Sequence, residues 1–314
     1  MRIYLCKRVL YSILVMWAVA TLVFFMLRAI PGDPVAVILG EEATPEAMVQ
    51  LRKNLGLDGP LYVQYVRWFA RLLRGDLGRS ILSGERVTVL LMQAAPRTFS
   101  IAALALCISL TVAIPAGIIS AVKKHTLLDH IATMIAFLGL SMPNFWLGIV
   151  LILFFSVNLQ WLPSMGYVSL AEGFWPWLRH LLLPAFTTGI VFSAIITRMT
   201  RSTMLEVLNE TYISTARSKG LLERVVVLKH ALRNALIPVI TVIGIAFSIL
   251  LVGTVVVEDV FAIQGLGRTL VRSIINRDFP VVQGAILLVS GIFVGMNLLV
   301  DILYTCINPK IRFE

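Results

Sequence analysis

The sequence predicts an all-α integral membrane protein with six transmembrane helices, and three observations point to this fold class. First, 58% of the 314 residues are hydrophobic and 14% are charged, with a mean hydropathy of +0.89. A typical soluble domain carries about 25% charged residues, so a soluble chain of this composition lacks the polar side chains to cover its core. Second, apolar runs recur at the ~20-residue length that spans a bilayer. Third, Lys and Arg gather in the short segments between alternate runs.

The first apolar run, Val9–Leu27, contains no charged residue. A signal peptide has an apolar core of about 7–15 residues, followed by a cleavage site of small residues. This run is 19 residues long and ends in the bulky Phe24-Phe25-Met26-Leu27, so we predict an uncleaved helix. The other predicted spans are Thr98–Val122, Ile131–Val157, Leu181–Thr197, Leu236–Val257 and Val281–Tyr304.

The basic residues predict the orientation. A net charge of +10 in so apolar a chain indicates Lys and Arg in cytoplasmic loops rather than a nucleic-acid partner. With the N-terminus inside, the termini and short loops carry fourteen Lys and Arg inside against four outside, and the long segment Ala29–Pro96 escapes the rule. We therefore expect both termini in the cytoplasm. The predicted organisation is residues 1–28 as the N-terminal end and first span, 29–96 as an external loop, 97–304 as the transmembrane core with a cytoplasmic loop at 198–235, and 305–314 as a cytoplasmic tail.

The external loop is expected to contain short helices. Thr44-Pro45-Glu46 has the order of an N-cap, a first-turn proline and a first-turn acid, and Gly56 is a suitable end for that helix. A second helix carries an apolar stripe. The stripe consists of Leu61, Tyr65, Trp68 and Leu72. Such a stripe either packs against other helices of the chain or lies on the membrane surface.

The cytoplasmic loop Arg198–Ala235 is too polar to span and too periodic to be unstructured. One apolar face at helical spacing is formed by Met204, Leu205, Leu208, Tyr212 and Ala216. Gly220 interrupts it, and a second helix is expected from Leu221 to Asn234. A membrane protein that projects an amphipathic helix–glycine–helix hairpin into the cytosol is expected to dock it into a partner protein.

The same loop carries a family resemblance. The segment from Glu210 to Gly220, ETYISTARSKG, resembles the "EAA" loop of importer permeases of the ATP-binding-cassette (ABC) superfamily, and His230–Pro238, HALRNALIP, is similar to the peptide/nickel branch. Further matches in the same order along the chain are Pro31-Gly32-Asp33-Pro34, Leu55-Gly56-Leu57-Asp58, Gly75-Asp76-Leu77-Gly78, Gly265-Leu266-Gly267-Arg268, Arg277-Asp278-Phe279-Pro280 and Asn308-Pro309-Lys310-Ile311-Arg312. Together they resemble the first of two permease subunits in a dipeptide, oligopeptide, glutathione or nickel importer.

The resemblance implies a set of partners. These are a second permease subunit, forming a heterodimer, two ATPase subunits that hold ATP and magnesium, an extracytoplasmic solute-binding protein, and the lipid of the bacterial inner membrane. It also implies that the hairpin couples to the ATPases. The residues carried over to this role are Glu210, Tyr212, Thr215, Ala216, Gly220, His230, Arg233 and Asn234. Ser214 stands where the family has the acidic residue of its motif, while the spacing of Thr215-Ala216 and Gly220 is retained.

Motifs for chemistry within the chain itself are not found. The sequence has no GxxxxGK[ST] to cradle ATP phosphates, no HExxH and no GxSxG. The three cysteines are far apart, so no disulfide framework or zinc site is indicated, and His125 and His130 flank a turn without an evident metal partner. We expect no catalytic, metal or cofactor site in this chain.

Polar residues within or beside the spans are candidates for the translocation path. Ser141-Met142-Pro143-Asn144 interrupts the third span, where Pro143 should bend the helix and Asn144 offers an amide at mid-membrane depth. These residues either line the path or serve helix packing. Candidate structural or gating residues are Asp33 beside the first span and Asn297 and Asp301 in the last.

Two other functional classes are alternatives for so apolar a chain. A secondary transporter driven by an ion gradient should show internal repeats with paired broken helices, which the sequence lacks. A membrane scaffold without transport activity is compatible with the composition. The importer differs from both in requiring a stoichiometric ATPase partner.

Overall fold

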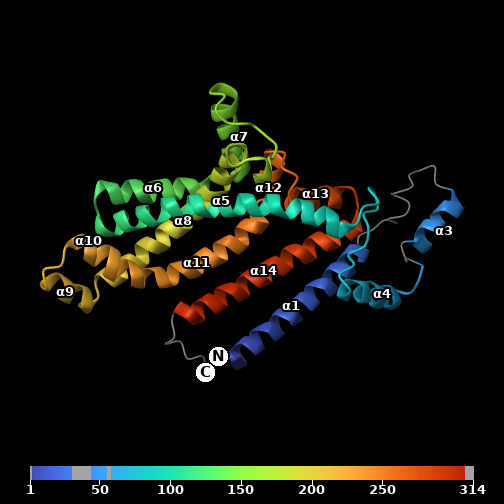
Figure 1. The fold of residues 1–314 in the computed structure, drawn as a ribbon, viewed down its shortest axis with the longest axis horizontal. Helices are drawn as coiled ribbons and strands as arrows, with labels where there is room; N and C mark the ends of the chain where they lie inside the picture. Colours follow the sequence, from blue (N-terminus) through green and yellow to red (C-terminus); the bar gives the residue numbers. More distant parts are fainter. Residues whose placement is uncertain (1, 30–43, 55–57, 308–314) are drawn as a thin grey trace. The chain divides into compact units, whose positions relative to one another are not determined.

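The computed structural model describes residues 2–29, 44–54 and 58–307, and in these ranges the chain is helical apart from turns and an isolated antiparallel bridge between Arg79 and Arg86 (Figure 1). The helices are α1 (Arg2–Ala29), α3 (Pro45–Asn54), α4 (Leu61–Leu73), α5 (Val87–Val122), α6 (Leu127–Ser141), α7 (Asn144–Leu151), the π-helix η1 (Ile152–Asn158), the 3-10 helix η2 (Leu170–Glu172), α8 (Phe174–Leu208), α9 (Thr211–Ser218), α10 (Glu223–Val225), the π-helix η3 (Val226–Ala231), α11 (Leu232–Gly253), α12 (Val255–Val260), α13 (Leu266–Ile275) and α14 (Phe279–Ile307).

Three of the predicted spans fall within long continuous runs of helix, and two more, Leu236–Val257 and Val281–Tyr304, overlap such runs and extend beyond their ends. These runs are Lys7–Ala29, Val87–Val122, Phe174–Leu208, Glu223–Leu251 and Phe279–Val300. The helix exceeds the predicted span most at the fourth, because α8 has 35 residues where the apolar run is Leu181–Thr197. Arg198 and Arg201 end the apolar run, but nothing in the sequence there breaks the helix, which continues to Leu208.

The third predicted span is broken. Helix α6 ends at Ser141, α7 begins at Asn144, and the axes on either side of the break differ by 103°. Pro143 lacks an N–H and disfavours helical geometry in the residue before it, and Met142 is accordingly extended (φ −87°, ψ 129°). The predicted bend is confirmed. By length and composition the described residues hold five spans, or six if this bent pair counts as one.

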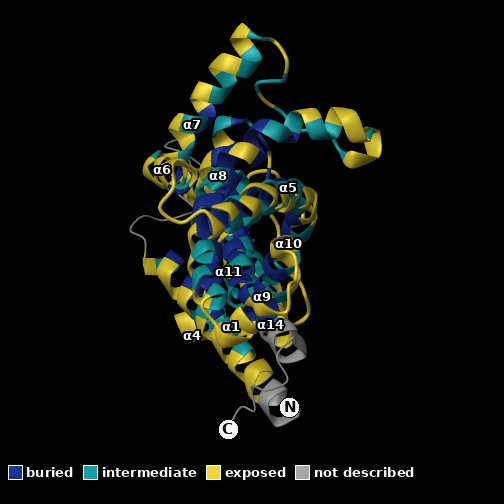
Figure 2. Cartoon of the chain, turned by 90° about the vertical axis from the view of Figure 1, so that its left-hand side faces the viewer, coloured by how far each residue is buried: buried dark blue, intermediate teal, exposed yellow. Residues whose placement is uncertain are grey.

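The chain divides into two compact units, and the first comprises residues 97–264 with the C-terminal part from Gly295. Its centre is α8, which contacts α6, α7 and α11. Of the most apolar window of α8, 67% of residues are buried, against 17% for α1, and Figure 2 shows this contrast between dark blue and yellow. An apolar cluster at one end of the unit includes Ile101, Leu181, Val257 and Phe261.

The second unit comprises residues 2–96 and 265–294. In it, Val23 and Leu27 of α1 pack against Val282 at the start of α14. A second cluster joins the start of α5 to α13 and α14. Its buried members are Val87, Leu91, Ala94, Leu266, Val281 and Ala285. Asp278 accepts hydrogen bonds from Ser80 Oγ (2.5 Å) and Ile81 N (3.1 Å), which fixes the turn before α14 to the segment before α5.

The short helices predicted between the first two spans are present as α3 and α4. Helix α3 begins at Pro45, as the Thr44-Pro45-Glu46 signal predicts, and Met48 N donates to Thr44 O at 3.1 Å. Its predicted end at Gly56, and the predicted structural residue Asp33, lie outside the described residues.

Candidate functional site

The predicted coupling segment is a folded hairpin, residues 209–234, which follows α8 and includes the first turn of α11. Helix α8 ends at Leu208, and the extended Glu210 (φ −70°, ψ 146°) turns the chain before α9. The prediction of one continuous apolar face is therefore wrong. Met204 and Ala216 are buried within this chain, whereas the Tyr212 side chain is 41% exposed, because the helical periodicity restarts on a new axis at Thr211.

The hairpin has its own core, shared with the helices that carry it. Residues of α5, α8, α9, η3 and α11 meet there. The buried members are Ala121, Met204, Ile213, Ala216, Val226, Val227, Ala231 and Ala235. Because protein interiors are close-packed, a displacement of α9 must move the ends of α5, α8 and α11 with it.

The turn of the hairpin is built around Gly220. Its φ is +75°, in the left-handed region that glycine adopts without strain, and its N–H donates to Arg217 O at 2.9 Å. Across the turn, Arg217 donates two hydrogen bonds to Glu223, at 2.7 and 3.2 Å. These bonds lower the pKa of the Glu223 carboxyl below its ordinary value. Both side chains are about half exposed, so the pair fixes the shape of the turn more than it stabilises the fold.

The second arm of the hairpin departs from the prediction. It begins at Glu223, includes the π-helix η3, and continues through α11 to Gly253 instead of ending at Asn234. Asn234 Nδ2 donates to Tyr212 Oη at 2.7 Å and to His230 O at 3.3 Å. Three predicted coupling residues, Tyr212, His230 and Asn234, are thus brought together where the two arms meet.

The outer surface of the hairpin contains most of the remaining predicted residues. Glu210, Thr215 and Arg233 are exposed, whereas Ala216 is buried. The prediction missed two exposed leucines directly after the glycine, Leu221 (41%) and Leu222 (75%). These leucines lie between a glycine and the first turn of the next helix, so they belong to no helical apolar face. This pattern is the sequence signal that could have predicted their exposure.

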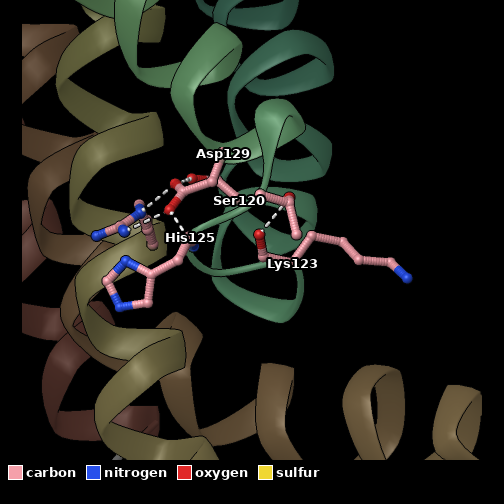
Figure 3. A network of polar contacts seen from close by, with 6 residues as sticks. Ser120, Lys123, His125 and Asp129 are labelled. Carbon is pink, nitrogen blue, oxygen red and sulfur yellow. Dashed lines mark hydrogen bonds and ion pairs between the residues drawn. The ribbon is translucent and has the colours of Figure 1, made fainter.

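A polar network next to the hairpin was also missed (Figure 3). Asp129, in the first turn of α6, is 3% exposed and accepts two hydrogen bonds from Arg201 of α8, both at 2.8 Å. The hydroxyl of Ser120 and the backbone N–H of His125 (3.0 Å) also donate to this carboxylate. His125 has a φ of 63° in the α5–α6 turn.

This network joins the α5–α6 turn to α8 two turns before the hairpin begins. A cavity of about 290 Å³ lies beside it, with Phe137, Leu140 and Ala194 on the apolar part of its lining. The sequence signal was that Asp129 is the sole acidic residue between Glu85 and Glu172, at the foot of an apolar run. A lone carboxylate there needs a cation, and Arg201 lies 72 positions away.

The candidate path residues gather at the break between α6 and α7. Ser141 Oγ donates back to Phe137 O at 2.9 Å, Pro143 precedes α7, and Asn144 is half-buried at its first position. Asn297 is half-buried on α14. The side chain of Asp301 lies outside the described residues.

A fully buried carboxylate that the prediction missed is Glu258 in α12. It accepts hydrogen bonds from Thr98 Oγ1 (2.6 Å) and Thr254 Oγ1 (3.0 Å). Nearby, Arg97 donates to Gln264 O at 2.7 Å. These contacts fix α12 and the segment after it to the α5 helix.

Comparison with known families identifies this architecture. Residues 113–313 match the model described as binding-protein-dependent transport system inner membrane component, and residues 1–102 match the model of the N-terminal part of such membrane components. The chain belongs to this family of ABC importer permeases. The permease is therefore a multi-span protein of the inner membrane, and its family works with ATPase and binding-protein partners. The resemblance drawn from the motifs is confirmed, and the secondary transporter is not supported.

Relatives of the permease cover its whole length. A peptide transport system permease protein of Brucella abortus is 45% identical over 308 residues, 98% of each chain. A glutathione transport system permease protein of Escherichia coli O6:H1 is 42% identical over 311 residues, 99% of each chain. Among solved structures, the MetNI methionine ABC transporter in an inward-facing form shares the fold, with a TM-score of 0.59 and 18% identity over 70% of the permease and 97% of that chain.

Proposed function

We propose that this chain is the first of two different permease subunits in an importer of small peptides or of a peptide-like solute such as glutathione. The names of relatives above 40% identity support this substrate class. The complex contains two ATPases that carry ATP and magnesium and a binding protein outside the membrane. Both termini of the permease are cytoplasmic, and the organisation into segments 1–28, 29–96, 97–304 and 305–314 is that expected from the sequence.

The observation that carries the proposal is the hairpin. It presents exposed apolar side chains, Leu221 and Leu222, at the tip of an element whose other side is locked into the ends of α5, α8 and α11. A docked ATPase that changes shape on ATP binding moves the hairpin, and the shared core transmits this movement to the spans. The ATPases can shift the equilibrium between the inward-open and outward-open states of the permease. The size of this shift is limited by the difference in their free energy of interaction with the hairpin between the two states.

Placing two charges on the tip of the hairpin is expected to detach the ATPases. In the variant Leu221→Asp/Leu222→Asp, two carboxylates replace apolar side chains that become desolvated on docking. Loss of a central apolar contact costs about 2 kcal/mol or more, which is over tenfold in affinity. The measurement is the amount of ATPase that co-purifies with the permease, together with substrate-stimulated ATP hydrolysis.

The matched control is Leu82→Asp, which changes a leucine in the segment before α5 whose exposure, 59%, lies between those of Leu221 and Leu222. It should leave ATPase recovery unchanged. Ala216→Arg is unsuitable, because Ala216 is buried in the hairpin core and the variant would disrupt the permease itself. If the double variant retains full ATPase recovery and full stimulated hydrolysis, the hairpin tip is not the docking surface.

The proposed topology predicts the labelling of an exposed residue in α3. A cysteine introduced by Glu46→Cys into a permease without other cysteines should react with a membrane-impermeant maleimide in intact spheroplasts, because residues 29–96 are external. The same reagent should label Ser218→Cys, at the exposed end of α9, only after the spheroplasts have been lysed. The reverse pattern would invert the orientation.

The break between α6 and α7 is proposed to line the path, with Ser141, Pro143 and Asn144 facing it. Replacing Asn144 by leucine should reduce substrate uptake by proteoliposomes several-fold, because it removes a polar group from a water-filled route while keeping a side chain with the same number of heavy atoms. The complex should assemble normally. Unchanged uptake would assign Asn144 to helix packing.

A further inference from the structure

We propose that α4 is an interfacial helix whose outer face contacts phospholipid, independently of what the permease transports. The outer face consists of an apolar arc, Tyr62, Val66 and Leu73, and an arginine arc, Arg67 and Arg71 together with the C-cap residue Arg74. The sequence left two possibilities for this helix, packing or membrane contact. The structure shows that α4 has separate sides for each.

The inner side of α4 is packed against the end of α1. Tyr65 shares a hydrogen bond with Thr21 (Oη to Oγ1, 2.8 Å), and its ring lies edge-on to Phe24 with centroids 5.2 Å apart. Trp68 lies at the same centroid distance from Phe24, and Arg28 Nε donates to Gln64 Oε1 at 3.0 Å. Tyr65 and Trp68 of the predicted stripe therefore serve packing, whereas Leu61 is 53% exposed.

These contacts fix the depth of α4 along α1. They involve α1 from Thr21 to Arg28, a length of about 10 Å at 1.5 Å per residue. Arg28 is the first charged residue after the uncharged run that begins at Val9, so it marks the end of the hydrocarbon-spanning part. Figure 1 shows α4 beside the end of α1 that is remote from the N-terminus. The helix thus lies at the boundary between hydrocarbon and headgroups.

The outer face has the chemistry of that boundary. At about 100° per residue, Tyr62, Val66 and Leu73 fall within about 40° of one another, and the three arginines occupy an arc of about 60° that begins some 80° further round. The apolar side chains are 71%, 63% and 75% exposed. Within the described residues, none of the three guanidinium groups has a carboxylate partner. The apolar arc therefore matches the acyl chains of a phospholipid, and the arginine arc beside it matches the phosphates of the headgroups.

The surface of α1 next to α4 favours lipid over a protein partner. On α1, Leu22 (60%) and Met26 (55%) are exposed at the same depth as the α4 contacts. Further exposed apolar residues continue from them along α1 toward its N-terminus. A protein that covered α4 would have to supply carboxylates to three arginines. A phospholipid leaflet supplies phosphates at that level and hydrocarbon below it, which covers α1 and α4 together.

The test uses the full-length permease in its purified importer complex, in nanodiscs of phosphatidylcholine and phosphatidylglycerol. Single cysteines carrying a nitroxide spin label are placed on the apolar arc (Tyr62→Cys, Val66→Cys, Leu73→Cys) and on the arginine arc (Arg67→Cys, Arg71→Cys, Arg74→Cys). Accessibility to oxygen, which concentrates in hydrocarbon, is compared with accessibility to a water-soluble nickel chelate. Met26→Cys serves as the lipid reference and Asp58→Cys as the water reference.

The oxygen-to-nickel ratio should be several-fold higher on the apolar arc than on the arginine arc and should approach that of Met26→Cys. A ratio on the apolar arc equal to that of Asp58→Cys would place the face in water and overturn the proposal. Protection of the apolar arc from both reagents would also overturn it, by showing that a protein subunit covers α4. Because cysteine at exposed positions leaves the α1 contacts intact, misfolding does not obscure the outcome.

Discussion

Replacing Asp129 by alanine is expected to lower the stability of the permease by about 2–3 kcal/mol. The change leaves Arg201 without its bidentate partner and leaves two further donors, Ser120 Oγ and His125 N, unsatisfied. Breaking a fully buried ion pair costs about 3–5 kcal/mol. Because the Arg201 side chain is 30% exposed and water can reach it, we expect less than that.

Arg217→Ala is the matched control, because it breaks the exposed Arg217–Glu223 pair and should cost about 0–1 kcal/mol. Thermal unfolding of the purified complex, followed by the loss of its size-exclusion peak, compares the two. The charge-reversed double variant Asp129→Arg/Arg201→Asp should not restore stability, because Ser120 and His125 continue to donate toward a position that has lost its acceptor. Equal melting temperatures for Asp129→Ala and Arg217→Ala would show that the Asp129 network does not stabilise the permease.

A side chain at Gly189 is expected to separate α5 from α8 and to prevent assembly of a stable permease. A Cβ at Gly189 would lie 2.7 Å from Ala105 O, a backbone atom that cannot move alone. At the same crossing, Ser109 Oγ donates to Gly189 O at 2.6 Å. Gly189→Ala should therefore cost at least the ~1–3 kcal/mol of an overpacked core, and Gly189→Leu should abolish recovery of folded protein.

Gly295→Ala provides the control within the same protein. Gly295 also lies inside a helix, and a Cβ there would meet nothing within 4 Å. Because alanine favours helix over glycine by about 1 kcal/mol, this variant should be neutral or slightly stabilised. The yield and melting temperature of the two variants measure the difference. Normal yield of Gly189→Leu would contradict the close crossing of α5 and α8.

The long helices could be predicted because their signal is local. An uninterrupted apolar run such as Val9–Leu27 has few structures available to it in a bilayer, and a proline such as Pro143 constrains its own backbone and that of the preceding residue. The full length of α8 could not be predicted, for a related reason. Hydropathy reports where a helix leaves the hydrocarbon, not where its hydrogen bonding stops, so Arg198 ended the apolar run without ending the helix.

The site was less predictable because its geometry depends on long-range contacts. The residues of the hairpin followed from their motif, but the turn at Asn209-Glu210 contains neither glycine nor proline, and so the buried Met204 and the exposed Tyr212 were assigned to one face. Asp129 and Arg201 are distant in sequence, and a single sequence does not say which arginine a lone carboxylate will meet. Exposure of Leu222 likewise follows from the left-handed backbone at Gly220, which steers the chain away from its own core.

The uninterrupted course of α8 has a mechanical consequence. From Pro184 to Leu208 it runs for 25 residues, about 37 Å, which exceeds the ~30 Å thickness of the hydrocarbon layer. A displacement of the Leu208 end therefore tilts the whole helix, including its part on the other side of the bilayer, because no break in the helix takes up the movement. The α6–α7 pair, bent by 103° at Met142-Pro143, is the opposite kind of element, because the break divides it into two shorter helices beside the continuous α8.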